Sequence, residues 1–329
     1  MIGAIRNVLC KHYIDRNHDP GASVLLASSG RAGSTWVAQV INYRNDYRLM
    51  FEPFREDVVP EAAVFRLNQY IRPTDKPAAL LAAAENIFSG RVRHDWVDAY
   101  NRRLFVSRRL IKAIRVNLFL KWTRVNFPTM PVVLLLRHPC AVAQSRIALG
   151  WHMDLEFRFL AQPALVEDAL VPFADAMRQA STEWERQIFA WCVENYVPLA
   201  QCSAGDVHIA FYENFCLNPE EELGRLGRFL KIPFDRRVSK ALTRPSKTTR
   251  TGQRGEGISS VVSGADAVEA WRPLVSDDDL QRAMDIVRLF GLDSIYGPEP
   301  APRGGAAVAA GTVAVASTQS WVTPGATTP

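Results

Sequence analysis

The chain has 329 residues, of which 48% are hydrophobic and 22% charged, and its formal net charge is +5. This composition is that of an ordinary globular protein, and the absence of any Lys/Arg run argues against a nucleic-acid partner. The five cysteines form no C-x-x-C pair, and their odd number argues against a disulfide framework and fits a reducing compartment. The six histidines lack metal-ligand spacing, so we infer no metal site.

No apolar run approaches the ~18 residues that a membrane-spanning helix needs. The first 20 residues carry several charges and lack the apolar core of a signal peptide. We therefore expect a soluble cytoplasmic protein.

The first recognisable element is a strand followed by a turn and a helix. The apolar run 24–27 predicts a buried strand, and 34–41 predicts a helix. The turn between them supplies glycines, a cation and hydroxyls: Gly30, Gly33, Arg31, Ser34 and Thr35. Such a turn binds anions, because free backbone N–H groups and the helix dipole both favour negative charge at a helix N-terminus.

This turn departs from the P-loop of nucleoside-triphosphate enzymes, G-x-x-x-x-G-K-[ST]. The first glycine of that motif falls at Ser28 and its lysine at Ser34. The usual contact of that lysine with the terminal phosphates is therefore missing.

Further along the chain, apolar strands alternate with helical patterns. The strands are expected near 23–27, 48–52, 108–114, 132–136 and 207–212. The helical patterns cover 60–71, 77–88, 118–127, 177–201, 219–230 and a last helix from Ser276 to Gly291. Continuous apolar strands between helices predict an α/β fold with a central parallel sheet flanked by helices.

Ligands of such sheets bind at the carboxyl ends of the strands. Five chemically active side chains lie at or just after the predicted strand ends: Arg31, Glu52, Lys112, Arg137 and Tyr212. Their shared position predicts one common cleft.

Several of these stretches resemble the sulfotransferases that use 3′-phosphoadenosine 5′-phosphosulfate. The run Arg31-Ala32-Gly33-Ser34-Thr35-Trp36 resembles their 5′-phosphosulfate loop. Arg137 at a strand end, with Ser145 eight residues on, resembles their 3′-phosphate site. Lys112 matches a lysine on the preceding strand, and the run Tyr212-Glu213-Asn214 resembles a late strand end whose tyrosine contacts the adenine.

The resemblance implies the P-loop-like sulfotransferase fold, a phosphosulfate donor with adenosine 3′,5′-bisphosphate as product, and no required metal. It places Arg31, Lys112 and the loop at the 5′-phosphate and the transferring group, and Arg137 and Ser145 at the 3′-phosphate. Trp36 occupies the position of an adenine-stacking aromatic, with a core helix residue as the alternative. Arg254, in the basic loop 247–257, matches part of a phosphate-closing loop, and a solvated surface loop is the alternative.

The base that deprotonates the acceptor hydroxyl differs from that of the cytosolic branch. That branch has a histidine two residues after the lysine, where this chain has Ile114. Glu52 is our candidate base, since the pair Glu52-Pro53 resembles the carbohydrate and bacterial branch. Glu52 could instead orient Arg31 or bind the acceptor, and His94 and His152 are weaker candidates for the base.

We expect one domain over 1–298, with helical excursions near 57–104 and 150–176, and a disordered Ala/Gly/Pro-rich tail over 299–329. Aromatic residues in the second excursion could line an acceptor pocket. The expected activity is sulfuryl transfer to a hydroxyl of a sugar, glycolipid or natural product. A kinase with a degenerate P-loop and a non-catalytic nucleotide-binding protein remain alternatives, and the sequence identifies neither the acceptor nor the oligomeric state.

Overall fold

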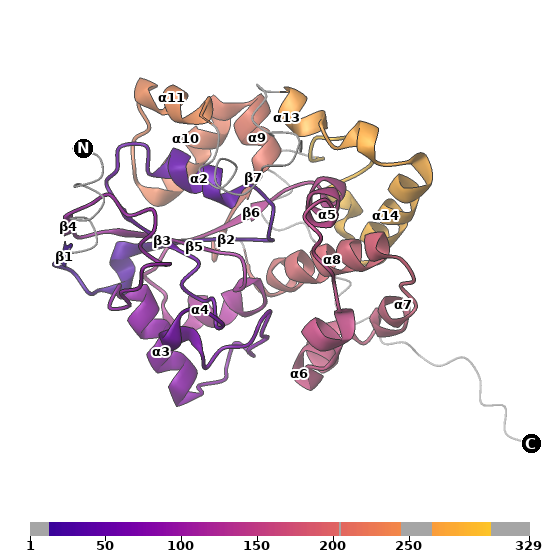
Figure 1. Cartoon of the computed structure of the whole chain (residues 1–329), viewed down its shortest axis with the longest axis horizontal. Helices are drawn as coiled ribbons and strands as arrows, with labels where there is room; N and C mark the ends of the chain where they lie inside the picture. Colours follow the sequence, from indigo (N-terminus) through magenta and orange to yellow (C-terminus); the bar gives the residue numbers. More distant parts are fainter. Residues whose placement is uncertain (1–12, 204, 245–264, 304–329) are drawn as a thin grey trace, which may run out of the picture.

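A computed structural model describes residues 13–203, 205–244 and 265–303. Five strands form one parallel sheet in the order β3-β5-β2-β6-β7, at the centre of Figure 1. The strands are β2 (Ser23–Ser28), β3 (Arg48–Phe51), β5 (Arg109–Ala113), β6 (Val132–Leu136) and β7 (His208–Phe211). The expected α/β fold with a central parallel sheet is confirmed, and each strand begins and ends within one residue of its predicted bounds.

The sheet forms from continuous apolar runs because both of its faces are buried. Neighbouring residues along β2 point to opposite faces, so Leu25 and Leu26 belong to different hydrophobic cores. Ile111 of β5 joins Leu25 in one core, and Leu110 joins Leu26 in the other. Each strand therefore needs apolar residues at every position.

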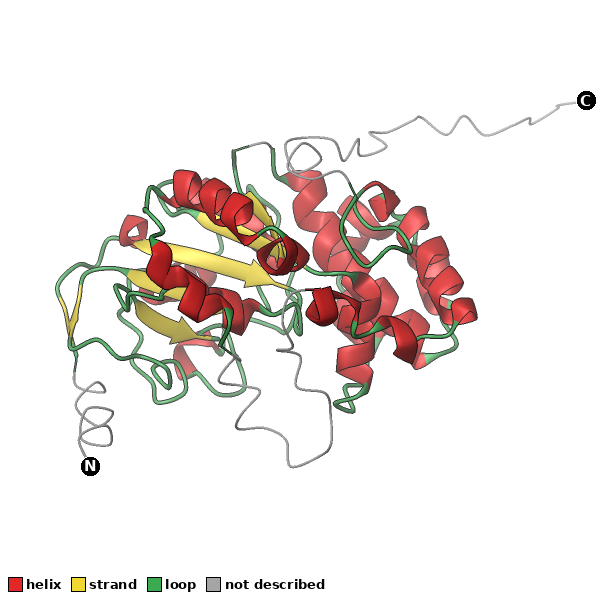
Figure 2. Cartoon of the chain, turned by 90° about the horizontal axis from the view of Figure 1, so that it is seen from above, coloured by secondary structure: helices red, strands yellow, loops and turns green. Residues whose placement is uncertain are grey.

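Helices cover both faces of the sheet. On one face lie α2 (Ser34–Ile41), α9 (Tyr212–Leu217), α10 (Pro219–Leu230) and α11 (Ser239–Leu242), as Figure 1 shows. The core of the other face includes residues of α3 (Ala78–Phe88), α4 (Leu120–Asn126), α5 (Pro139–Ile147), α8 (Glu183–Gln201) and α14 (Asp277–Leu289). Figure 2 shows the strands on one side of the molecule and a group of helices, α8 and α14 among them, on the other.

The remaining elements are short. They are the strands β1 (Ile14–Asp15) and β4 (Phe105–Val106), the helices α6 (Pro163–Leu165), α7 (Ala174–Arg178) and α13 (Ala265–Glu269), and two π-helical segments, Glu156–Leu160 and Val166–Leu170. Single 3₁₀ turns cover Pro20–Ala22, Pro60–Ala62, Asn117–Phe119, Arg236–Val238, Arg272–Leu274 and Leu292–Ser294.

One predicted helix is wrong. The pattern over 60–71 forms only the 3₁₀ turn Pro60–Ala62, followed by turns. Asn68 adopts the left-handed region, with φ of 52°, which ends any helix at that point. The backbone N–H of Tyr70 donates instead to Oε1 of Gln162 at 2.8 Å. Phe65, Tyr70 and Ile71 of the pattern are thus buried by tertiary contacts rather than by a helix face.

The long helix expected over 177–201 is divided. α7 ends at Arg178 and α8 begins at Glu183, because Thr182 and Glu185 form a capping box. The Thr182 hydroxyl accepts from the Glu185 N–H at 3.2 Å, and the Glu185 carboxylate accepts from the Thr182 N–H at 3.1 Å. This reciprocal pair fixes a helix start inside the apolar pattern.

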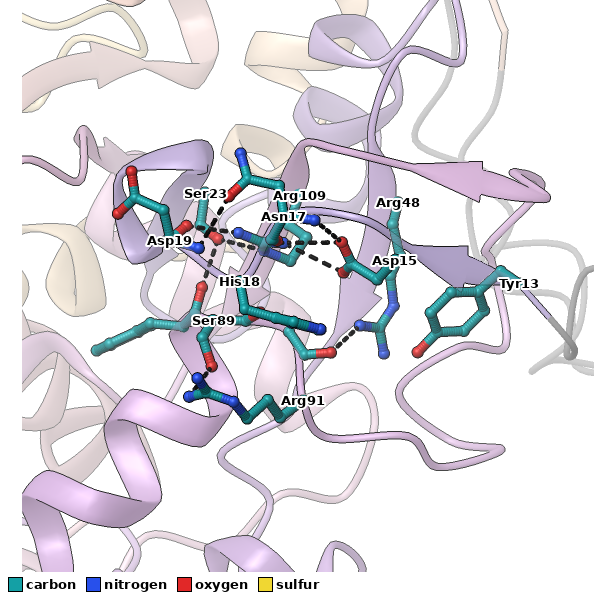
Figure 3. A network of polar contacts seen from close by, with 12 residues as sticks. Tyr13, Asp15, Asn17, His18, Asp19, Ser23, Arg48, Ser89, Arg91 and Arg109 are labelled. Carbon is teal, nitrogen blue, oxygen red and sulfur yellow. Dashed lines mark hydrogen bonds and ion pairs between the residues drawn. The ribbon is translucent and has the colours of Figure 1, made fainter.

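A polar network fastens the chain at the amino ends of the strands (Figure 3). Arg109 opens β5, and its fully buried guanidinium donates to Ser23 Oγ at 2.7 Å and pairs with Asp15 at 3.1 Å. Arg48 opens β3, is also fully buried, and pairs with Asp98 at 2.8 Å. These two hydrogen-bonded arginines hold the parallel pair β1–β4 and its neighbouring loops at the amino ends of the strands, at the end of the sheet opposite the predicted cleft.

The described chain continues past the expected domain end at residue 298. The backbone N–H of Arg303 donates to Ile295 O at 2.7 Å, and its guanidinium donates to Asp293 O at 3.1 Å. Residues 299–303 therefore contact the domain, whereas the rest of the expected tail lies outside the described residues. No helix in the described ranges has the length and apolar character that crossing a membrane requires.

Candidate active site

The turn between β2 and α2 forms a cradle at the carboxyl end of the sheet. Arg31 and Gly33 adopt left-handed backbone conformations, with φ of 75° and 87°. Gly33 is the N-cap of α2 and offers no side-chain cap, so N–H groups of the first helical turn remain available to a ligand. A Cβ at Gly33 would lie 2.5 Å from Cδ2 of Tyr212, so only glycine fits here.

The loop cation and the predicted 3′-phosphate residues converge. Arg31 Nε donates to Ser145 Oγ at 3.0 Å, across more than a hundred residues of sequence. Arg137 follows β6, and its Nη1 donates to Arg31 O at 3.1 Å. The guanidinium of Arg137 also lies 4.4 Å from the ring centroid of Tyr212. The two motifs lie far apart in the sequence, and the structure brings their residues into one group.

Among the described residues, the two arginines of this group have no anionic partner. Within the described part of the chain, neither Arg31 nor Arg137 has a carboxylate oxygen within 4.0 Å. Loss of surrounding water lowers the pKa of Arg31, and the charges of Arg137 and Arg146 lower it further. Two like charges held together without a counter-charge favour an anionic ligand between them.

Glu52 and Lys112 form a buried pair at the ends of the neighbouring strands β3 and β5. The backbone N–H of Glu52 donates to Lys112 O at 2.8 Å, which extends the sheet by one residue. Oε1 of Glu52 pairs with Nζ of Lys112, and Oε2 accepts from the Ile114 N–H at 3.0 Å. The two residues are only 3% and 5% exposed. Glu52 therefore lies beside the predicted transfer site, with both carboxylate oxygens engaged.

Two predicted adenine contacts pack against each other. The rings of Trp36 and Tyr212 lie 5.4 Å apart at 62°, and Phe215 lies 6.3 Å from Trp36. Both predicted residues are almost buried, and Tyr212 opens α9 instead of closing β7. They form the wall behind the cradle, with Tyr212 touching both Gly33 and Arg137.

The remaining predicted site residues are distributed unevenly. Ala32 and Ser34 are buried within the cradle, and Thr35 is half-buried. His94 is engaged in its own turn, where Nδ1 accepts from the Trp96 N–H at 3.1 Å. His152 is exposed at the rim of a nearby cavity. Arg254 and its loop lie outside the described residues.

This cavity, of about 300 Å³, adjoins the cradle. It is lined by Gly30, Leu67, Asn68, Ile114, Arg115, Arg146, Trp151, His152, Arg158 and Glu194. Of the aromatic residues in the excursion over 150–176, Trp151 lines the cavity, whereas Phe159 and Phe173 are buried in the core. Whether this cavity takes an acceptor stays a prediction.

Sequence reasoning missed most of the polar residues of this cavity. Arg146 directly follows Ser145, and Glu194 lies on the buried face of α8 three residues after Trp191. A carboxylate on an apolar helix face is a usable signal, because a buried charge needs a partner. Asn68 and Arg158 carry no such signal in the sequence.

A larger cavity, of about 960 Å³, lies elsewhere. All of its lining residues fall between Pro219 and Leu242, on α10 and the segment after it, and none of them is a strand-end residue of the cleft. No three His, Cys, Asp or Glu side chains are arranged to hold a metal ion in the ranges that the structure covers.

No protein-family model and no curated protein matches the chain. Among solved structures, the sulfotransferase domain of the curacin biosynthetic pathway matches with a TM-score of 0.45 at 13% identity, over 82% of this chain and 96% of that one. The sulfotransferase domain of a Synechococcus olefin synthase matches with a TM-score of 0.44 at 17% identity, over 80% and 94%. A mouse sulfotransferase complexed with PAP matches with a TM-score of 0.43 at 11% identity, over 86% and 88%.

Proposed function

We propose that this protein is a sulfotransferase that moves a sulfuryl group from 3′-phosphoadenosine 5′-phosphosulfate to an acceptor hydroxyl. The observation that carries the proposal is the convergence of Arg31, Arg137 and Ser145 beside a helix N-terminus, where no carboxylate of the described residues lies within 4.0 Å of either arginine. Such a group is built for a ligand with more than one anionic centre.

The donor residues fit a nucleotide with phosphates on both sides of its ribose. The cradle over 31–35 and Lys112 would hold the 5′-phosphate and the sulfuryl group. Arg137 and Ser145 would hold the 3′-phosphate, which explains why Ser145 lies within reach of the loop cation. The donor supplies an activated sulfuryl group, and the protein contributes positioning and stabilisation of spreading negative charge.

Glu52 and Lys112 would act together during transfer. Lys112 would turn from Glu52 toward the bound anion, which leaves one carboxylate oxygen of Glu52 free to accept the acceptor proton. The acceptor oxygen would then form its bond to sulfur as the bond between sulfur and the leaving phosphate oxygen breaks. The proton would remain on Glu52, and the negative charge would remain on the leaving phosphate near Lys112.

A kinase with a degenerate P-loop is the competing function. The structure places Ser34 where a P-loop lysine would stand, inside the first turn of α2. Lys112 approaches the site from β5 instead. The arrangement therefore favours the sulfuryl donor, and ATP binding that requires magnesium would favour the kinase.

Calorimetry tests the proposal. Adenosine 3′,5′-bisphosphate should bind in the presence of a metal chelator, and adenosine 5′-monophosphate should bind at least about tenfold more weakly, since charge-assisted contacts are lost. Arg137→Gln should remove that selectivity. Arg178→Gln, on the exposed surface of α7, is the matched control and should retain it. Equal affinities for the two nucleotides would disprove the role of Arg137 and Ser145.

Mass spectrometry then tests the reaction itself. A metabolite extract incubated with the donor and the enzyme should gain products heavier by one sulfuryl group. The same extract without enzyme is the control.

A further inference from the structure

A second group of cations lies beside the proposed transfer site. The cavity of about 300 Å³ contacts Gly30 of the cradle and Ile114, whose N–H holds the Glu52 carboxylate. This volume suits a single sugar or aromatic ring, at the lower end of the range for ligand sites. Trp151 forms part of the wall, packed so closely on Gly30 that a Cβ there would lie 2.9 Å from its ring.

The charged side chains of this cavity are three arginines and one carboxylate: Arg115, Arg146, Arg158 and Glu194. Arg146 is 1% exposed, and its Nε donates to Gly30 O at 3.0 Å while Nη2 pairs with Glu194 at 2.7 Å. Its Nη1 is buried and makes no hydrogen bond to the described residues. A buried charged donor without an acceptor is costly, so part of the Arg146 charge is left unsatisfied in the wall of the cavity.

Arg158 also lacks a strong partner. Its Nη1 reaches Asn68 Oδ1 only at 3.5 Å, and no carboxylate of the described residues lies within 4.0 Å of its guanidinium. Burial lowers the pKa of Arg158, Glu194 raises it, and the charges of Arg146 and Arg115 lower it. The charges of Arg146 and Arg115 therefore reach Arg158.

Counter-charges balance only part of this group. Glu194 pairs with Arg146, and Glu56, outside the cavity lining, pairs with Arg115 at 3.3 Å. Asp154 acts on Arg158 more weakly than either neighbouring arginine does. Among the described residues, Arg158 is therefore the arginine of this cavity that has no ion pair.

We infer that this cavity binds an anionic group of the acceptor. The acceptor is then a ring-sized hydroxyl compound that carries a carboxylate or a phosphate, with its hydroxyl directed toward Glu52 and its anionic group toward Arg146 and Arg158. The hydroxyl's role rests on the proposed sulfuryl transfer, whereas the anion site follows from the arginines alone.

Calorimetry with matched probes tests this inference. The protein is first saturated with adenosine 3′,5′-bisphosphate, so that Arg31 and Arg137 are occupied. It is then titrated with 4-hydroxybenzoate against 4-hydroxybenzamide, and with glucose 6-phosphate against glucose. In at least one pair, the charged member should bind about tenfold or more tightly than the neutral one. The pair that shows this preference distinguishes a carboxylate from a phosphate.

Two variants localise the effect. Arg158→Gln should reduce the preference for the charged member about tenfold and leave nucleotide affinity unchanged. Arg178→Gln, outside the cavity, should change neither. The inference is overturned by equal affinities within both pairs, by no binding of either charged probe, or by a preference that Arg158→Gln leaves intact.

The same titrations without nucleotide separate this inference from the proposed function. Loss of selectivity for the bisphosphate, together with an anion preference that depends on Arg158, would disprove the donor assignment and retain the anion site. Selectivity for the bisphosphate without any anion preference in the probe titrations would disprove the anion site and retain the donor assignment.

Discussion

Replacing Glu52 by glutamine separates the chemical role of this residue from its structural role. In the native protein the Ile114 N–H donates to Oε2 of Glu52 at 3.0 Å. Glutamine keeps the size of the side chain and still offers an oxygen to this N–H. It removes the negative charge that pairs with Lys112, a residue 5% exposed. Breaking a buried ion pair by removing one partner costs about 3–5 kcal/mol.

The lower end of that range applies here. Nζ of Lys112 lies 4.9 Å from the ring centroid of Phe51, and this cation–π contact remains in the variant. A loss of about 3 kcal/mol should lower the melting temperature by roughly 4–5 °C, because a chain of 329 residues has an unfolding entropy of about 0.7 kcal/mol/K. If Glu52 accepts the acceptor proton, turnover should also fall by about 10²–10⁴-fold.

Turnover is measured by mass spectrometry at saturating donor and acceptor, below the melting temperature of the variant. The double variant Glu52→Gln with Lys112→Met is the control, because it removes both charges of the pair. It should regain most of the lost melting temperature and remain inactive. Near-native turnover of the Glu52→Gln enzyme would refute the base assignment, and His152 would be tested next because it lies at the rim of the adjoining cavity.

Two further predictions concern the cradle and the helix that follows β6. Gly33→Ala places a methyl group 2.5 Å from Tyr212, and calorimetry should show that it weakens binding of adenosine 3′,5′-bisphosphate about tenfold or more. Gly205→Ala is the control, because Gly205 has a φ of 91° and nothing within 4 Å of an added Cβ. It should cost a similar ~1–2 kcal/mol of backbone strain and leave nucleotide affinity unchanged. Equal affinity losses in the two variants would contradict the cradle geometry. Burial lowers the pKa of His138 from 6.5 to about 4, so the unfolded chain binds the proton first and stability should fall by about 3 kcal/mol as pH drops from about 6.5 toward 4. His138→Asn keeps an acceptor for the Cys140 N–H but does not titrate in this pH range. Urea unfolding between about pH 6.5 and 4 should therefore show that the variant lacks the fall in stability that His138 causes. An unchanged pH profile would show that His138 is not the group responsible.

The sheet could be predicted because its signal is local. Each strand is a short apolar run bounded by polar residues, and both faces are buried, so no pairing information is needed to recognise it. Ligands of parallel sheets bind at the carboxyl ends of the strands, which is why Glu52 and Lys112 are expected to share one cleft. The direct pairing of Glu52 with Lys112 depends on β3 lying beside β5, and the sequence pattern does not predict which strands are neighbours.

The errors arose where distant contacts override local patterns. The expected helix over 60–71 yields to the left-handed Asn68 and to the hydrogen bond from Tyr70 to Gln162. Arg146 and Glu194 meet across 48 residues of sequence, so their shared cavity depends on how α5 packs on α8. The motif of Trp36 is compatible with the site and with the core, and the structure places its ring, 8% exposed, in a hydrophobic core against Tyr212.

The order of the strands has a consequence for the synthesis of the chain. β2 is the first of the five strands to leave the ribosome, yet it is the central strand, and its neighbours are β5 and β6. Arg109 of β5 follows Ser23 by 86 residues, which corresponds to about 4–17 s of translation. During that interval the backbone N–H and C=O groups at both edges of β2 have no native partner. The nascent chain must therefore be shielded until both neighbouring strands emerge, and fragments that end before β6 are expected to aggregate rather than fold.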